Sequence, residues 1–114
     1  MLATDLPHIT TDAEFQQALA EHDQLMVCCG RNGPMCLPVY DVMESIQDRY
    51  ETVAFKVMAF DSAVAHNIKS LPECRSFMGL PFTVYFKGGK VVKATSSIQS
   101  KGQVTAILDQ HFEG

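Results

Sequence analysis

Apolar positions along the chain follow two spacings, one typical of helices and one typical of buried strands. Residues 25–29 and 53–60 form nearly continuous apolar runs of strand length. Such runs are expected for central strands that are buried on both faces of a sheet. Between them, apolar side chains recur at helical spacing over residues 39–50. The pattern therefore predicts a strand, a helix and a second strand in that order.

Capping signals mark a helix near each end of the chain. Thr11 and Glu14 have the spacing of a capping box, and the apolar positions behind them predict a helix that ends near residue 22. Ser100 and Gln103 have the same spacing in front of the last apolar-periodic stretch, so they predict a second capped helix. Shorter helices are predicted between these two, at residues 63–68 and 72–78.

Three further stretches are extended and rich in β-forming residues. Gly88-Gly89 separates residues 82–87 from residues 90–95, and this connection predicts a hairpin, because primed turns need positive φ angles. Residues 7–10 predict a short edge strand. The predicted order is β-α-β-α-β-α-β-β-α. It indicates an α/β fold, with a central mixed sheet of about five strands and helices on both faces.

Composition and charge narrow the class of protein. The chain has 114 residues, 46% of them hydrophobic and 19% charged, which predicts one globular domain over residues 1–114. The net charge of −4 argues against nucleic acid or an acidic membrane surface as a partner. No apolar run approaches the roughly 18 residues of a membrane span, and no export signal is visible. We therefore expect a cytoplasmic protein.

Four cysteines are the main candidates for chemistry. In a reducing compartment we expect them to be thiols rather than structural disulfides. Their spacing does not fit a zinc site, so we expect neither a metal nor another cofactor. The four are Cys28, Cys29, Cys36 and Cys74. Cys28 and Cys29 lie in the first apolar run and are expected to fill the core, whereas Cys74 is expected on the surface.

The stretch from Arg31 to Pro38 lies between the first predicted core strand and the long helix that follows. It contains a Gly33-Pro34 turn and the thiol of Cys36. A small α/β domain would place a thiol site at such a junction, because the N-terminus of a helix stabilises a thiolate. This stretch is therefore the predicted centre of chemistry.

Four short segments, at residues 46–50, 79–82, 86–90 and 100–109, resemble the thioredoxin family, and the resemblance covers nearly the whole chain. Gly79-Leu80-Pro81-Phe82 is similar to the Gly-Ile-Pro-Thr segment of that family, whose proline is cis and faces the active site. The hairpin, the end of the second helix and the last helix are similar too. These segments are Phe86-Lys87-Gly88-Gly89-Lys90, residues 46–50 and residues 100–109. The resemblance implies the thioredoxin fold and thiol–disulfide exchange.

The family's chemistry depends on Trp-Cys-Gly-Pro-Cys, and this chain departs from that motif. Three alignments remain open. If Gly33-Pro34 matches the family's Gly-Pro, Asn32 and Met35 replace the two cysteines. If the helix is aligned without gaps, Gly33 replaces the attacking cysteine and Cys36 takes the resolving position. In a third register Cys36 is the lone attacking thiol, which requires three extra loop residues. In none of them is there a C-x-x-C pair, a tryptophan or the strand aspartate.

Two functions follow from the resemblance. The first is an atypical thiol–disulfide protein, in which Cys36 is the reactive group and forms a mixed disulfide with a protein or peptide partner. The second is a redox-inactive module that holds an extended peptide by backbone hydrogen bonds. We expect a monomer or a weak dimer. For both functions the resemblance implies a binding groove formed by the same residues: Asn32, Gly33, Pro34, Leu80 and Pro81.

Overall fold

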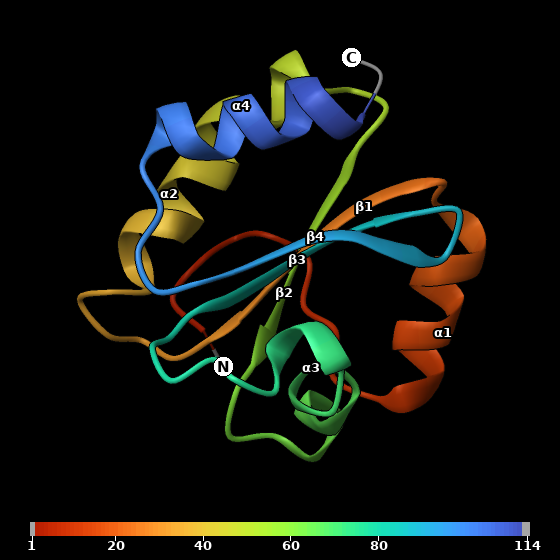
Figure 1. Ribbon diagram of the computed structural model, residues 1–114, viewed down its shortest axis with the longest axis vertical. Coiled ribbons are helices and arrows are strands. Elements are labelled where there is room, and N and C mark those ends of the chain that lie inside the picture. Colours follow the sequence, from red (N-terminus) through yellow and green to blue (C-terminus); the bar gives the residue numbers. More distant parts are fainter. Residues whose placement is uncertain (1, 113–114) are drawn as a thin grey trace.

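The computed structural model describes residues 2–112, in which a mixed four-stranded sheet separates two layers of helices (Figure 1). The strand order is β2-β1-β3-β4. Strands β1 and β2 are parallel, whereas β3 is antiparallel to both β1 and β4. The strands are β1 (Gln24–Gly30), β2 (Ala54–Ala59), β3 (Phe82–Lys87) and β4 (Lys90–Ser96). The mixed sheet confirms the α/β fold predicted from the sequence.

The helices lie on both faces of this sheet (Figure 1). Helices α2 (Leu37–Ile46) and α4 (Lys101–His111) cover one face. Helices α1 (Asp12–Glu21) and α3 (His66–Lys69) cover the other. Three short 3-10 helices complete the list: η1 (Gln47–Arg49), η2 (Ala63–Ala65) and η3 (Pro72–Cys74).

The capping and turn signals fold as the sequence predicts. Thr11 and Glu14 form a complete capping box at the start of α1, and Ser100 forms one with Gln103 at the start of α4. The hairpin glycines Gly88 and Gly89 have φ angles of 59° and 79°. These residues fix where two helices begin and where β3 turns back into β4.

Three predicted elements differ in extent. The edge strand at residues 7–10 is reduced to a single bridge between His8 and Val57, so the described part of the sheet has four strands. The helix predicted over residues 39–50 begins at Leu37 and changes to the 3-10 helix η1 after Ile46. The helix predicted over residues 72–78 is only the single turn η3.

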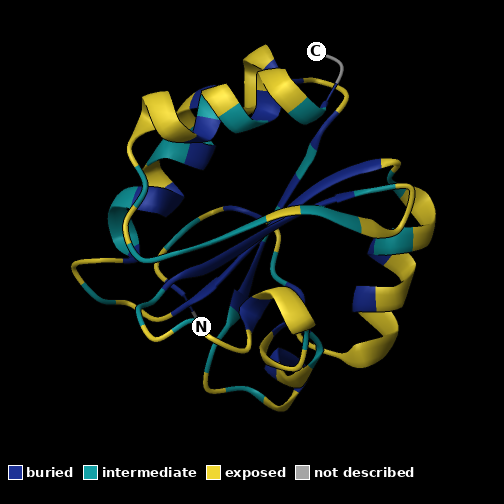
Figure 2. Cartoon of the chain, in the orientation of Figure 1, coloured by how far each residue is buried: buried dark blue, intermediate teal, exposed yellow. Residues whose placement is uncertain are grey.

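The core is divided by the sheet, whose central strands are buried (Figure 2). Every residue of β1 is buried, which agrees with its continuous apolar sequence. Alternate side chains of β1 point to opposite faces, so Cys28 packs in the cluster under α2 and α4, whereas Cys29 packs in the cluster on the α1 side. Within residues 2–112, no helix is long and apolar enough to cross a membrane.

Candidate thiol site

Cys36 is the N-cap residue of α2, and only 2% of its surface is exposed. A turn leads into α2 just before Cys36. The backbone N–H groups of Cys36 and Leu37 close this turn by donating to the carbonyl of Gly33, at 3.1 and 3.0 Å. Pro38 lies in the first turn, where the absence of an N–H group costs no helical hydrogen bond. The thiol is therefore held at a helix N-terminus but covered.

Gly30, the last residue of β1, allows three groups to meet above it. A Cβ atom on Gly30 would lie 2.7 Å from the Tyr40 hydroxyl oxygen, 2.8 Å from the Cys36 sulfur and 3.0 Å from Pro81 Cβ. The first two distances are shorter than real Cβ atoms show, and the third is tighter than nine in ten real Cβ contacts. Only a glycine at this position lets the thiol, the phenol and the proline turn converge.

Two hydrogen-bonding groups surround the Cys36 sulfur. The backbone N–H of Arg31 donates to Cys36 Sγ at 3.4 Å. The Tyr40 hydroxyl donates to the Arg31 carbonyl at 3.0 Å, and it shares with the Cys36 sulfur the space above Gly30. Burial raises the pKa of the Tyr40 phenol, and the neighbouring thiols raise it further. Tyr40 therefore stays protonated under ordinary conditions.

The peptide bond between Leu80 and Pro81 is cis, and Pro81 is buried beside Gly30. The turn before it is tied to the end of β4, because the N–H of Ser97 donates to the carbonyl of Gly79 at 3.0 Å. Met78 and Ile98 flank this hydrogen bond and are 97% and 43% exposed. The cis-proline turn therefore has exposed apolar side chains next to it.

The three loop residues predicted to bind a partner lie before α2. Gly33 is half-buried, whereas Asn32 and Pro34 are exposed. The Asn32 side-chain oxygen accepts a hydrogen bond of 2.6 Å from the backbone N–H of Ala3, which ties the N-terminal segment to this loop. Gly30 brings Cys36 and Pro81 together, and the other predicted residues lie in the two segments around them.

An ion pair lies on the other side of the loop that precedes α2. The Arg31 guanidinium makes two bonds of 2.8 Å to the Asp61 carboxylate, and it lies 5.2 Å from the centre of the Phe60 ring. The Arg31 hydrogen bonds lower the pKa of Asp61. Lys69 lies 4.1 Å from the centre of the same ring. Because the pair is exposed, it positions the Arg31 side chain more than it stabilises the fold.

The other three thiols are free and buried, and none of them lies at the start of α2. Cys28 accepts a hydrogen bond from the Thr83 hydroxyl at 3.6 Å, and burial raises the pKa of its thiol. Burial also raises the pKa of Cys29 to about 12 and that of Cys74 to about 11. The prediction that Cys74 is a surface thiol is wrong: it is 2% exposed, because η3 turns it into the cluster around Phe82.

Sequence reasoning did not single out Tyr40 or Gly30. Tyr40 belongs to the apolar-periodic helix and would be read as a core residue. The available signal was its position four residues after Cys36, which places two side chains on the same face of a helix. Gly30 ends an apolar strand, where a glycine often marks the close approach of other groups.

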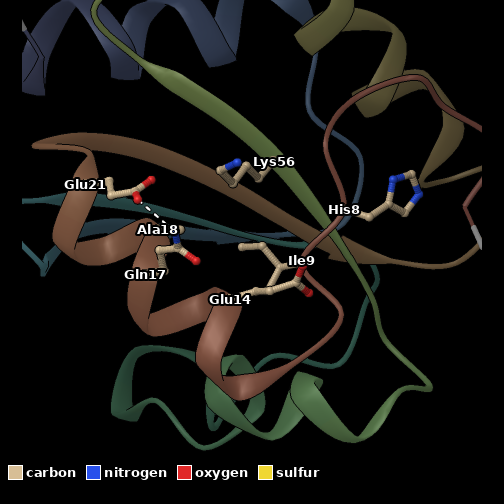
Figure 3. Close-up of a pocket in the computed structure, with 7 residues that line it drawn as sticks. All are labelled: His8, Ile9, Glu14, Gln17, Ala18, Glu21 and Lys56. Carbon is tan, nitrogen blue, oxygen red and sulfur yellow. Dashed lines mark hydrogen bonds between the residues drawn. The ribbon is translucent and has the colours of Figure 1, made fainter.

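A separate, polar hollow lies between α1 and the edge strand β2 (Figure 3). Gln17 donates a hydrogen bond of 2.8 Å to Glu21 on its rim, and Lys56 lies on the opposite side. The His8 ring points away from the hollow (Figure 3). None of the residues predicted for the thiol site lines it.

The fold and this geometry can be compared with known proteins. No family model and no curated protein sequence matches the chain. A thioredoxin mutant from Halobacterium salinarum superposes with a TM-score of 0.78 at 16% identity, covering 95% of this chain and 91% of that one. Oxidised thioredoxin from Plasmodium falciparum gives 0.77 at 12% identity, covering 96% and 100%. Mitochondrial thioredoxin 3 from Saccharomyces cerevisiae gives 0.72 at 20% identity, covering 91% and 94%. The chain therefore has the thioredoxin fold.

Proposed function

We propose that this chain is a thioredoxin-like protein of thiol homeostasis that performs at most single-thiol disulfide exchange, with Cys36 as the reactive group. The observation that carries the proposal is the convergence of the Cys36 sulfur and the cis Leu80–Pro81 turn above Gly30. The same point receives the Arg31 N–H group, a donor that favours a thiolate. No other thiol of the chain has this combination of helix N-terminus, donor and proline turn.

Burial supports the alignment in which Cys36 stands at the position of the family's resolving cysteine. The attacking thiol of the family is exposed, whereas Cys36 is 2% exposed and Gly33, three residues earlier, is half-buried. Gly33 would then replace the attacking cysteine. A site with only the second thiol lacks the first step of the family's cycle, so exchange through Cys36 would be slow.

The exchange reaction through one thiol is simple to balance. The Cys36 thiolate attacks one sulfur of a partner disulfide, a new S–S bond forms, and the partner's other sulfur leaves as a thiolate that takes a proton from water. No second thiol is in the motif to release the partner. An external low-molecular-weight thiol must therefore reduce the mixed disulfide and regenerate Cys36.

The partner proposed for this step is an extended protein or peptide segment. The groove proposed for this segment would lie between Asn32, Gly33 and Pro34 on one side and Leu80 and Pro81 on the other. Backbone groups beside Pro81 would pair with the segment, as in other cases of strand-like recognition. The exposed side chains of Met35, Met78 and Ile98 favour a segment with apolar side chains.

The second candidate is a binding module in which no thiol step occurs. The specific observation in its favour is that Cys36 is covered while its loop exposes Met35, whose surface is 43% accessible. In this case the groove beside Pro81 holds the partner without a covalent bond. Both candidates fit a reducing compartment such as the cytoplasm, because all four cysteines are free thiols.

One experiment separates the two candidates. The wild type and Cys36→Ser are incubated with insulin, and both the release of insulin thiols and the mass of the mixed disulfide are followed. Single-thiol exchange predicts an adduct at Cys36 without rapid turnover, and no adduct in Cys36→Ser. Absence of an adduct in the wild type, with partner binding intact in Cys36→Ser, would contradict the thiol function and support the binding module.

A further inference from the structure

The Tyr40 hydroxyl oxygen and the Cys36 sulfur lie above the same residue: a Cβ atom on Gly30 would meet them at 2.7 and 2.8 Å. Tyr40 lies in the second turn of α2, four residues after Cys36, so both side chains emerge on the same face of the helix. Its ring is fully buried, and its oxygen would lie 2.7 Å from a Cβ atom on Gly30. This phenol is part of the thiol site and not only of the core.

Its single proton has two acceptors within reach. The hydroxyl donates to the Arg31 carbonyl at 3.0 Å, and the Cys36 sulfur lies beside the same point above Gly30. While Cys36 is a thiol, the carbonyl is the better acceptor. When Cys36 ionises, its negative charge makes the sulfur the better acceptor, because charge-assisted hydrogen bonds are about twice as strong as neutral ones.

We propose that Tyr40 is a positioning residue for Cys36, whose hydroxyl turns from the Arg31 carbonyl to the sulfur when the thiolate forms. The inference rests on the proposed thiol function and adds to it the group that stabilises the reactive state. Together with the Arg31 N–H, the phenol completes a pocket of two donors around the thiolate. Neither donor comes from a carboxylic acid, so the pocket works without the aspartate that β1 lacks.

The surrounding groups allow Tyr40 to act as a donor. Burial raises the pKa of its phenol, so the proton is present whenever the thiol ionises. The other ionisable groups near the sulfur are Cys28 and Cys29 of β1 and the Arg31 guanidinium. Burial raises the pKa of both strand thiols, so they stay neutral, and the guanidinium is bound to Asp61.

The test compares Tyr40→Phe with the wild type by the alkylation rate of Cys36 as a function of pH, resolved by mass spectrometry of the peptide that contains it. Tyr40→Phe removes one oxygen and keeps the ring. We expect alkylation at neutral pH to slow by about tenfold, the size of a hydrogen bond to a charged group. We also expect the rate to reach its plateau at a higher pH, because the thiolate has lost a donor.

Tyr50→Phe is the matched control, because it removes another buried tyrosine's hydroxyl hydrogen bond, the 2.7 Å bond to Asp109, away from the thiol. It should leave the pH profile of Cys36 unchanged. Fluorinated tyrosine, incorporated site-specifically at position 40, provides a second test that keeps every heavy atom of the Tyr40 side chain. It strengthens the phenol as a donor and should speed alkylation at neutral pH.

Two results would overturn the proposal. One is a Tyr40→Phe profile that coincides with the wild type. The other is a rate that rises by the same factor at every pH, which would mean that Tyr40 only packs the loop over the sulfur. Alkylation needs no partner disulfide, so failure of the exchange function leaves this test intact. If Tyr40→Phe forms the mixed disulfide with insulin at the wild-type rate, the role of Tyr40 is refuted but the thiol function of Cys36 is not.

Discussion

Cys36 and Cys74 are equally covered, yet their surroundings differ. Each thiol is 2% exposed. Cys36 caps a helix of ten residues and receives the Arg31 N–H at 3.4 Å, with the Tyr40 hydroxyl beside it. Cys74 ends a 3-10 turn of three residues in an apolar cluster, where burial raises the pKa of its thiol to about 11.

Under the proposed function, exposure alone does not identify the reactive cysteine. A buried thiol without donors is held neutral, because burial penalises the charged form. A thiol that is equally buried but lies beside hydrogen-bond donors and a helix N-terminus has groups that stabilise the negative charge of its thiolate. The two cysteines of one chain therefore provide an internal comparison, in which the fold and the solution conditions are the same.

The largest expected effect is on covalent capture of a disulfide. Cys36→Ser should abolish formation of a mixed disulfide with insulin, whereas Cys74→Ser should leave it at the wild-type level. Both changes replace one buried sulfur by oxygen, so the second variant controls for the effect on packing. Mass spectrometry of the intact chain measures the adduct. Equal capture by both variants would remove the distinction between the two thiols.

A smaller effect concerns the contact point above Gly30. Gly30→Ala should lower the free energy of unfolding by about 1–3 kcal/mol, as expected for overpacking, because its Cβ would meet Tyr40, Cys36 and Pro81 at 3.0 Å or less. Gly33→Ala is the matched control, since nothing lies within 4 Å of a Cβ at that position. Urea unfolding measures both, and an unaffected Gly30→Ala would show that the three groups are not in tight contact.

The pH dependence of the free energy of unfolding tests whether burial keeps the Cys74 thiol neutral. The pKa of Cys74 is about 11 in the folded chain, against 9.0 for an ordinary thiol. The unfolded chain loses this proton first, so the stabilisation is complete below about pH 9 and is lost as pH rises through 11. Cys74→Ala should make the decline between pH 9 and 11 shallower, by about 2 kcal/mol. An unchanged slope would mean that Cys74 is not shielded.

The smallest effect is expected for the ion pair beside the site. Asp61→Asn removes the partner of the Arg31 guanidinium but leaves the backbone N–H of Arg31 in place. Because the pair is exposed, we expect little change in thermal stability and an alkylation rate of Cys36 within about twofold of the wild type. A much larger change would show that the side chain of Arg31, and not its backbone, controls the thiol.

The fold could be predicted from the sequence because local signals agree with one another. The capping residues Thr11 and Ser100 and the Gly88-Gly89 turn act over three or four residues, and the structure reproduces them. The extent of the edge strand could not be predicted. Residues 7–10 make only the bridge from His8 to Val57, and the length of that pairing depends on tertiary packing.

The sequence predicts where the candidate site lies but not the contacts within it. The strand before residue 31 and the helix after residue 36 locate the junction. The burial of Cys74 and the contact of Tyr40 with Cys36 depend on how η3 and α2 are rotated against the sheet. No periodic pattern fixes that rotation accurately enough to predict a single contact, so these features can be identified only from the structure.

The most direct test is to measure the alkylation rates of Cys36 and Cys74 in the same folded wild-type chain at neutral pH. A neutral alkylating reagent is used, and the modified peptides are separated and quantified by mass spectrometry. The two thiols are equally covered, so a difference in rate reports on the groups around each sulfur. We predict that Cys36 reacts at least about tenfold faster, the effect of one hydrogen bond to a charged group. Equal rates, or a faster Cys74, would contradict the assignment of Cys36 as the reactive thiol.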